Sequence, residues 1–175
     1  MTLAALFAAL CVVLLYIASI WPTGQLGLVA VASLFVAAGV IEGGKSGIKV
    51  GLAVFVVSSF IGMLILPNRV APLLFIIFFG YYPVLKSLLE RISKNMLQWV
   101  LKLLVFNAAL AIIWFALNDL FLGFMDSLPI VSEIDPQIMS FAALVIAANI
   151  VFVIYDYGFT KLIWFYIQRV SSKIK

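Results

Sequence analysis

Residues 3–21 are LAALFAALCVVLLYIASIW, a run that contains no charged residue and that ends at the turn Pro22-Thr23-Gly24. About 20 apolar residues in a helix cross the hydrocarbon core of a bilayer, and a helix satisfies its own backbone hydrogen bonds there. The whole chain of 175 residues is 66% hydrophobic and 10% charged, whereas soluble domains are about 25% charged. The sequence therefore predicts an all-α integral membrane protein.

Five further apolar runs follow the first. We expect transmembrane helices over residues 3–21, 26–41, 48–66, 70–85, 96–118 and 137–157, which form a single domain, a six-helix transmembrane bundle. Two basic amphipathic segments, residues 86–95 and 161–175, are expected at the cytoplasmic membrane surface. Because the first run lacks a basic start and is longer than the apolar part of a signal peptide, we expect it to be retained.

The basic residues are divided unequally between the gaps. Ten of the eleven Lys and Arg lie in or at the edges of the gaps after the second, fourth and sixth runs, with Lys49 and Lys102 just inside the runs that follow, and Arg69 alone lies in the other set of gaps. Lys and Arg are retained on the cytoplasmic side of a membrane. The sequence therefore predicts a multi-pass protein with both termini in the cytoplasm, and it favours anionic lipids over nucleic acid as partners of these charges.

The residue types available also limit the chemistry. The chain has no His, and its one cysteine, Cys11, lies inside the first run, so thiols can form neither a metal cluster nor an intrachain disulfide. Paired acids at membrane depth and a nucleophile with an adjacent base are not visible either. We expect no enzymatic activity, no metal and no cofactor.

Residues 39–46, GVIEGGKS, match the phosphate-loop pattern GxxxxGK[ST], and Asp156 follows an apolar stretch that resembles a magnesium-binding strand. A phosphate loop needs a buried strand before it and a helix after it, within a soluble α/β sheet. The flanking runs are long and apolar enough to be membrane helices instead. We expect a tight turn in which Gly43, Gly47 and Gly51 form a packing face, because small residues let membrane helices approach closely.

Two amides are expected near the middle of the membrane. Asn107 lies about 16 Å from the inner end of the fifth run and Asn149 about 18 Å from the outer end of the sixth, at 1.5 Å per residue. Polar side chains in hydrocarbon either bond to one another or contact a ligand. We expect these two amides to be hydrogen-bonded to each other, and we keep both as candidate substrate-binding residues.

A candidate binding site lies toward the outer face. Trp114, Asn118 and Asp119 fall at the end of the fifth run, and Arg69 lies in the outer turn between the third and fourth. The aromatic ring would stack on a ligand, the guanidinium would meet an anionic group, and the amide or carboxylate would orient it. The alternative is an interfacial Trp anchor and an Arg that contacts lipid phosphate.

At the inner face, Tyr81 and Tyr82 are expected at the headgroup level, and Pro83 is expected to kink the fourth helix. The segment after it places apolar side chains on one face and charged ones on the other; the apolar face has Leu85, Leu88, Leu89 and Ile92, and the charged face has Lys86, Glu90, Arg91 and Lys94. Asp156 is expected to form a local ion pair with Lys161.

Ala4, Ala5, Ala8 and Ala9 place two small-xxx-small pairs on neighbouring faces of the first helix. Such a stripe serves either packing within the bundle or docking of another membrane protein. With residues 2–10, TLAALFAAL, and residues 44–52, GKSGIKVGL, the chain resembles the S components of energy-coupling factor transporters. These are small six-helix bacterial membrane proteins that capture vitamins or metals.

The resemblance implies a substrate-capture subunit of the bacterial inner membrane, which binds a vitamin-like molecule from outside. Ala4, Ala5, Ala8 and Ala9 would then dock on a membrane coupling subunit that cytoplasmic ATPases drive. The first outer loop is very short for this family, and no ligand-specific motif is matched. The alternative is a structural or scaffold membrane protein similar to the rod-shape protein MreD, whose small-residue faces would bind other membrane proteins permanently.

Overall fold

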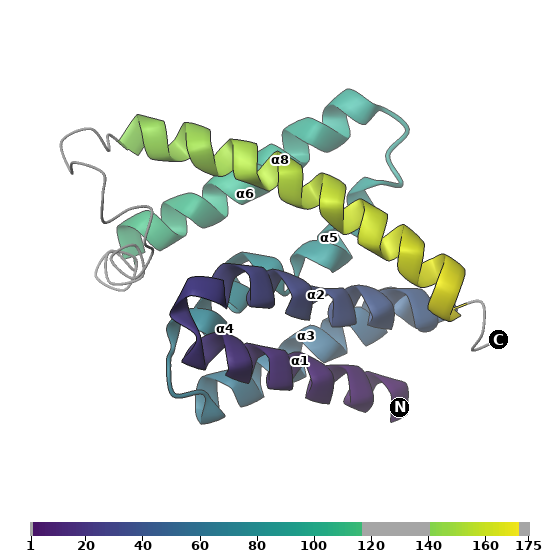
Figure 1. Cartoon of the computed structure of the whole chain (residues 1–175). Coiled ribbons are helices and arrows are strands. Elements are labelled where there is room, and N and C mark those ends of the chain that lie inside the picture. The colour runs from purple at the N-terminus through teal and green to yellow at the C-terminus, as the bar shows by residue number, and fades with distance from the viewer. Residues whose placement is uncertain (1, 117–140, 172–175) are drawn as a thin grey trace.

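The computed structural model describes residues 2–116 and 141–171, and every regular element in that part of the chain is helical (Figure 1). Six helical segments there are long and apolar enough to cross a membrane, which confirms the predicted all-α class. The elements are α1 (Thr2–Ile20), η1 (Pro22–Gly24), α2 (Gln25–Glu42), η2 (Gly44–Ser46), α3 (Gly47–Ile65), α4 (Val70–Leu74), η3 (Phe75–Phe79), α5 (Tyr82–Leu89), α6 (Asn95–Ala116), α8 (Phe141–Tyr166) and η4 (Ile167–Ser171).

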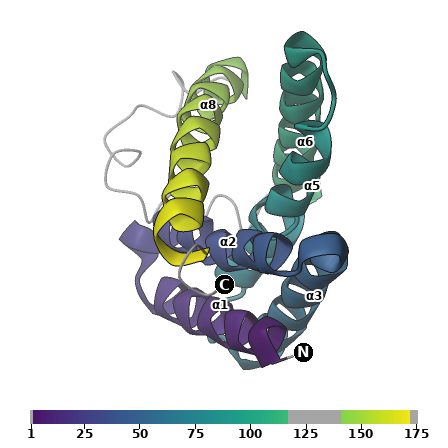
Figure 2. The same cartoon turned by 90° about the vertical axis from the view of Figure 1, so that its right-hand side faces the viewer.

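Helices α1, α2 and α3 pack against one another (Figure 2). Helices α6 and α8 extend on the other side of α2 and contact each other where they cross (Figure 1). The α1–α3 part and the α4 and α5 segments share a core of fully buried apolar side chains, which includes Cys11, Leu15, Val36, Val54 and Phe75. Cys11 thus serves as a small apolar core residue. By contrast, α6 and α8 bury only a small part of their apolar surface, so most of it faces the surroundings of the protein.

The predicted glycine face is confirmed at the contact between α2 and α3. A Cβ atom added to Gly47 would lie 2.0 Å from the carbonyl oxygen of Val40, and one added to Gly51 would lie 2.3 Å from Val40 Cγ2. Gly44 has a φ of +52°, the left-handed conformation that glycine adopts without strain, and it reverses the chain between the two helices. Close approach of the two backbones therefore requires glycine in this turn.

The phosphate-loop pattern lies in this same turn. Residues 39–46 form the end of α2 and the 3₁₀ turn η2, and residues 2–116 and 141–171 contain no strand. The strand that a phosphate loop follows is therefore not found beside the motif in the part of the chain that the structure describes. Its glycines are explained by helix packing.

The fourth membrane segment differs from the single helix expected over residues 70–85. It consists of α4, the π-helical turn η3 and α5, and it runs on to Leu89. The break lies at Gly80-Tyr81, before Pro83, which occupies the first turn of α5, where a proline costs no backbone hydrogen bond. A Cβ on Gly80 would lie 2.5 Å from the ring of Phe55, so the ring packs directly on the backbone at the break.

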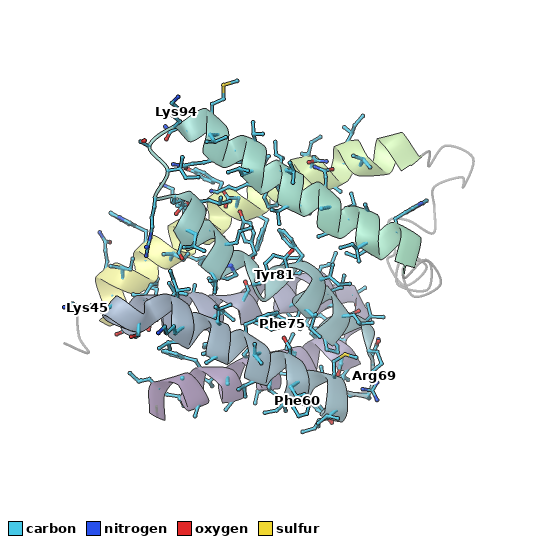
Figure 3. The ribbon with its side chains drawn as sticks, turned by 180° about the vertical axis from the view of Figure 1, so that it is seen from behind. Lys45, Phe60, Arg69, Phe75, Tyr81 and Lys94 are labelled. Carbon is cyan, nitrogen blue, oxygen red and sulfur yellow. The ribbon has the colours of Figure 1, made fainter. Side chains whose placement is uncertain are left out.

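The ends of the helices follow the predicted alternation. Lys45 and Lys94, from two of the basic gaps, lie at one end of the molecule, and Arg69 lies at the opposite end (Figure 3). The beginning of α1 and the end of η4 also lie at one common end (Figure 1). The chain therefore runs from one end of the bundle to the other an even number of times, which returns it to the end at which α1 begins.

The contact between α2 and α3 gives a direct test. Replacing Gly47→Ala should lower the free energy of unfolding by about 1–3 kcal/mol, because the methyl group would overlap the Val40 carbonyl oxygen. Gly27→Ala in α2 is the matched control, since nothing lies within 4 Å of its Cβ position. Thermal unfolding of both purified variants in detergent measures the difference. Equal stability of the two variants would contradict the close packing.

Candidate functional site

A cluster of charged side chains lies inside the bundle where α5, α6 and α8 meet. Lys86 comes from α5, Lys102 from α6 and Asp156 from α8, and Glu90 follows the last residue of α5. We call these four residues the ionic ring. Each of the three helices contributes one charge from a segment that is long and apolar enough to cross the membrane.

In the ionic ring, the two ammonium groups alternate with the two carboxylates. Lys86 Nζ lies 2.5 Å from Asp156 Oδ1 and 2.6 Å from Glu90 Oε1. Lys102 Nζ lies 3.0 Å from Asp156 Oδ2 and 3.1 Å from the same Glu90 Oε1. The hydroxyl of Tyr82 donates a further hydrogen bond of 2.5 Å to Asp156 Oδ1. Each carboxylate thus bridges both lysines.

Burial of the ionic ring is deep at three of its four members. The side chains of Lys86, Lys102 and Asp156 are 2%, 5% and 4% exposed, whereas that of Glu90 is 43% exposed. Removing charges from water costs several kcal/mol per ion unless each is paired and hydrogen-bonded. Two positive and two negative groups meet that condition, so the ring is neutral as a unit.

Aromatic side chains lie about one helical turn from the charged members of the ionic ring. Phe106 of α6 stacks on Phe152 of α8 with centroids 4.5 Å apart, and Tyr82 meets Phe152 edge-on at 5.6 Å. The Tyr155 hydroxyl lies 3.1 Å from Ser33 Oγ and thereby joins α8 to α2. These rings keep water away from the charges, which strengthens the electrostatic attraction between them.

The predicted amide pair is confirmed. Asn107 and Asn149 exchange two hydrogen bonds, with Nδ2 to Oδ1 distances of 2.9 and 3.0 Å. Each Nδ2 also donates to a carbonyl oxygen of its own helix, that of Leu103 or Val145. The pair joins α6 to α8, and a ligand that used either amide would have to compete with these bonds.

Three expectations for the inner face are wrong. Asp156 pairs with Lys86 and Lys102 and not with Lys161, whose ammonium lies 5.4 Å from the ring centroid of Tyr157. Tyr82 is fully buried, whereas an interfacial aromatic anchor at the headgroup level would be exposed. Lys86 was expected on the exposed face of a surface segment, but it is buried in α5.

One signal in the sequence could have located the ionic ring. Tyr82, Lys86 and Glu90 recur every four residues, so they share one face of a helix that continues past Leu85. Lys102 likewise lies inside the apolar run 96–118 and not in a gap. Charges near the end of an apolar run are usually solvated, so this pattern alone does not indicate that the charges meet in a buried cluster.

The alanine stripe of α1 is divided by the fold. Ala8 is 4% exposed and its carbonyl oxygen accepts a hydrogen bond from Ser58 of α3, and Ala4 packs against the core. Ala5 and Ala9 are exposed. Ala8 is therefore not exposed for docking, and Ala5 and Ala9 remain at the surface of α1. Docking itself stays a prediction.

The outer candidate site is described only in part. Arg69 is exposed and immediately precedes α4, and Trp114 lies half-buried near the end of α6. Asn118 and Asp119 lie outside the described residues, as does the segment between α6 and α8. The proposed cluster of four side chains stays a prediction.

Neither metal-binding groups in the described residues nor comparison with known proteins assigns a further functional site. Over residues 2–116 and 141–171, no three His, Cys, Asp or Glu side chains come together in a group that could hold a metal ion. Comparison with protein families, with curated proteins and with solved structures finds no match to this chain.

Removing one charge from the ionic ring should destabilise the protein strongly. Asp156→Asn leaves two buried ammonium groups with one half-exposed carboxylate, so we expect the free energy of unfolding to fall by about 3–5 kcal/mol. Adding Lys86→Met restores a one-to-one balance between Lys102 and Glu90 and should recover part of the loss. Thermal unfolding in detergent measures both.

Lys161→Gln is the control for this experiment. Its side chain is exposed, and a surface substitution of this kind changes stability by about 0.5 kcal/mol or less. A double variant less stable than Asp156→Asn alone would show that charge balance does not govern the ring.

Proposed function

We propose that this chain is the substrate-capture subunit of an uptake system for a vitamin-like small molecule, in the cytoplasmic membrane of a bacterium. It has both termini in the cytoplasm and docks on a membrane coupling subunit that ATPases drive. The observation that carries the proposal is the exposed pair Ala5 and Ala9 on α1, next to Ala4 and Ala8, which are used for packing inside the bundle.

The exposed pair supports docking for a steric reason. Ala5 and Ala9 lie one helical turn apart, so together they form a shallow strip on a helix whose neighbouring exposed side chains, Leu6 and Leu10, are large. Contact between membrane helices depends on van der Waals packing, and small residues allow the backbones to come close. A partner helix can pack closely against such a strip and gain van der Waals contact, whereas lipid chains gain no comparable contact.

The pairing of the buried charges supports the proposal that a partner protein supplies the energy for uptake. Lys86, Lys102 and Asp156 are the charged side chains that are buried in the described part of the chain, and all of them are engaged in the ionic ring. The ring neutralises itself and joins α5, α6 and α8. A capture subunit that is driven by a partner needs no ion pathway of its own, and charges that are already paired with one another are compatible with this role.

Ligand capture is assigned to the end of the bundle at which Arg69 lies. That end is opposite Lys45 and Lys94 (Figure 3), and it faces outside if the basic gaps are cytoplasmic. Arg69 would bind an anionic group and Trp114 would stack on an apolar ring. Asn118 and Asp119, which lie outside the described residues, stay predicted members of the site.

Docking can be tested by copurification. Ala5→Trp and Ala9→Trp should each reduce the amount of coupling subunit and ATPase that copurifies by about tenfold, a loss of about 1.4 kcal/mol in binding, because the indole would hold the partner helix away. Ala53→Trp on α3 is the matched control, since Ala53 is also an exposed helical alanine. Association that survives both α1 substitutions would count against the docking surface.

Capture is tested by mass spectrometry of the protein purified in mild detergent. We expect a bound compound of vitamin size, and we expect Arg69→Ala and Trp114→Ala to reduce its retention because they remove the charge and the stacking surface. Arg91→Ala and Trp164→Ala are the matched controls, both exposed and away from the proposed site. A protein that carries no compound and whose variants behave like the controls would exclude the site.

A scaffold protein is the second candidate, and one observation favours it. In the membrane segments of α6 and α8, 17% of the residues are buried, against 22% in α3 and 44% in α2 and in the α4–α5 segment. Broad apolar surfaces of this kind can bind another membrane protein permanently as well as contact lipid. Stable copurification with other membrane proteins, no bound compound and no effect of the α1 substitutions together would favour the scaffold.

A further inference from the structure

Glu90 differs from the other three members of the ionic ring. Its side chain is 43% exposed, and only one of its two carboxylate oxygens, Oε1, contacts the lysines, at 2.6 Å from Lys86 Nζ and 3.1 Å from Lys102 Nζ. Asp156, by contrast, is held by Lys86, Lys102 and Tyr82 through both of its oxygens. The ring therefore consists of a buried part with one carboxylate and two ammonium groups, and of an exposed carboxylate that completes its neutrality.

We propose that Lys86 and Lys102 form a binding site for a phosphate oxyanion, and that the Glu90 carboxylate occupies this site in the present structure. Asp156 compensates one of the two positive charges permanently. The second charge is compensated by whichever anion reaches the two ammonium groups from the exposed side. A phosphate oxygen has the charge and the acceptor geometry to replace Glu90 Oε1 between them.

The local backbone allows this exchange. Glu90 is the first residue after α5, and its N–H donates to the carbonyl oxygen of Lys86 at 2.9 Å, while the next two N–H groups close the turn onto Leu88 and Leu89. The main chain stays fixed by these bonds. Only the side chain of Glu90 has to rotate outward, toward the surface at which it is already half exposed.

The rim of the site favours anions at the membrane surface. Arg91 and Lys94 are exposed in the connection between Glu90 and α6, and they would attract an acidic group. Trp99 lies 5.4 Å from Lys102 Nζ and is 39% exposed, which is typical of an aromatic side chain at the headgroup level. An acidic phospholipid headgroup and free phosphate share the chemistry that this site requires.

The experiment compares Glu90→Gln with Glu42→Gln, a control at another partly exposed glutamate. Each purified protein is titrated with phosphatidylglycerol, phosphatidylcholine or inorganic phosphate, and bound species are counted by native mass spectrometry. Glu90→Gln should bind the anionic probe about tenfold more tightly than the wild type, since the competing carboxylate is gone. Glu42→Gln should bind like the wild type.

Two further variants complete the test. Adding Lys102→Gln to Glu90→Gln should abolish the gain, because one of the two cations is lost. If Glu90→Gln alone does not yield folded protein, Glu90→Asp keeps the charge, shortens the reach of the carboxylate and should give a smaller gain in the same direction.

The probes identify the source of the oxyanion. A gain for phosphatidylglycerol without one for inorganic phosphate assigns the site to a lipid headgroup, and a gain for inorganic phosphate assigns it to a soluble phosphate. Equal binding by the wild type and all Glu90 variants would overturn the proposal. These outcomes do not depend on docking through α1 or on ligand capture at the opposite end.

Discussion

Charge compensation inside the bundle is the constraint on which the arrangement of α5, α6 and α8 depends. Lys86, Lys102 and Asp156 are nearly inaccessible, and each would be costly to bury alone. Their pairing is possible only if the three helices meet at one depth and in one rotation. The ring therefore fixes both the register and the orientation of the helices that carry it, which an apolar contact of similar area would do less specifically.

A second polar contact defines the relation of α6 to α8. Asn107 follows Lys102 by about 8 Å along α6, and Asn149 precedes Asp156 by about 10 Å along α8, at 1.5 Å per residue. Between these two layers, Phe106 and Phe152 stack. Since two polar contacts at different depths restrict both sliding and rotation, α6 and α8 behave as one unit at this end, although much of their surface is not covered by the rest of the chain.

The α1–α3 part is held together by a different means. Its contacts are mostly apolar and depend on small residues, such as Gly47 and Gly51 against Val40. A hydrogen bond from Ser58 Oγ to the carbonyl oxygen of Ala8 adds to them. Packing of this kind requires close backbones and little directional bonding. The proposed docking surface fits this difference, because the shallow strip of Ala5 and Ala9 on α1 suits packing against a partner helix. The polar contacts of α5, α6 and α8 instead hold these helices to one another.

The sequence by itself determined the membrane class, the number of apolar helices, the glycine packing face at the start of α3 and the amide pair. All of these follow from composition, run length and helical periodicity, which are properties of one segment or of two segments at a common depth. It did not locate the ionic ring, the break at Gly80-Tyr81 or the burial of Ala8. Those depend on which faces of separate helices meet. A charge such as Lys86 or Asp156 is solvated or buried according to its neighbours in space, and only the tertiary structure brings the compensating charges together.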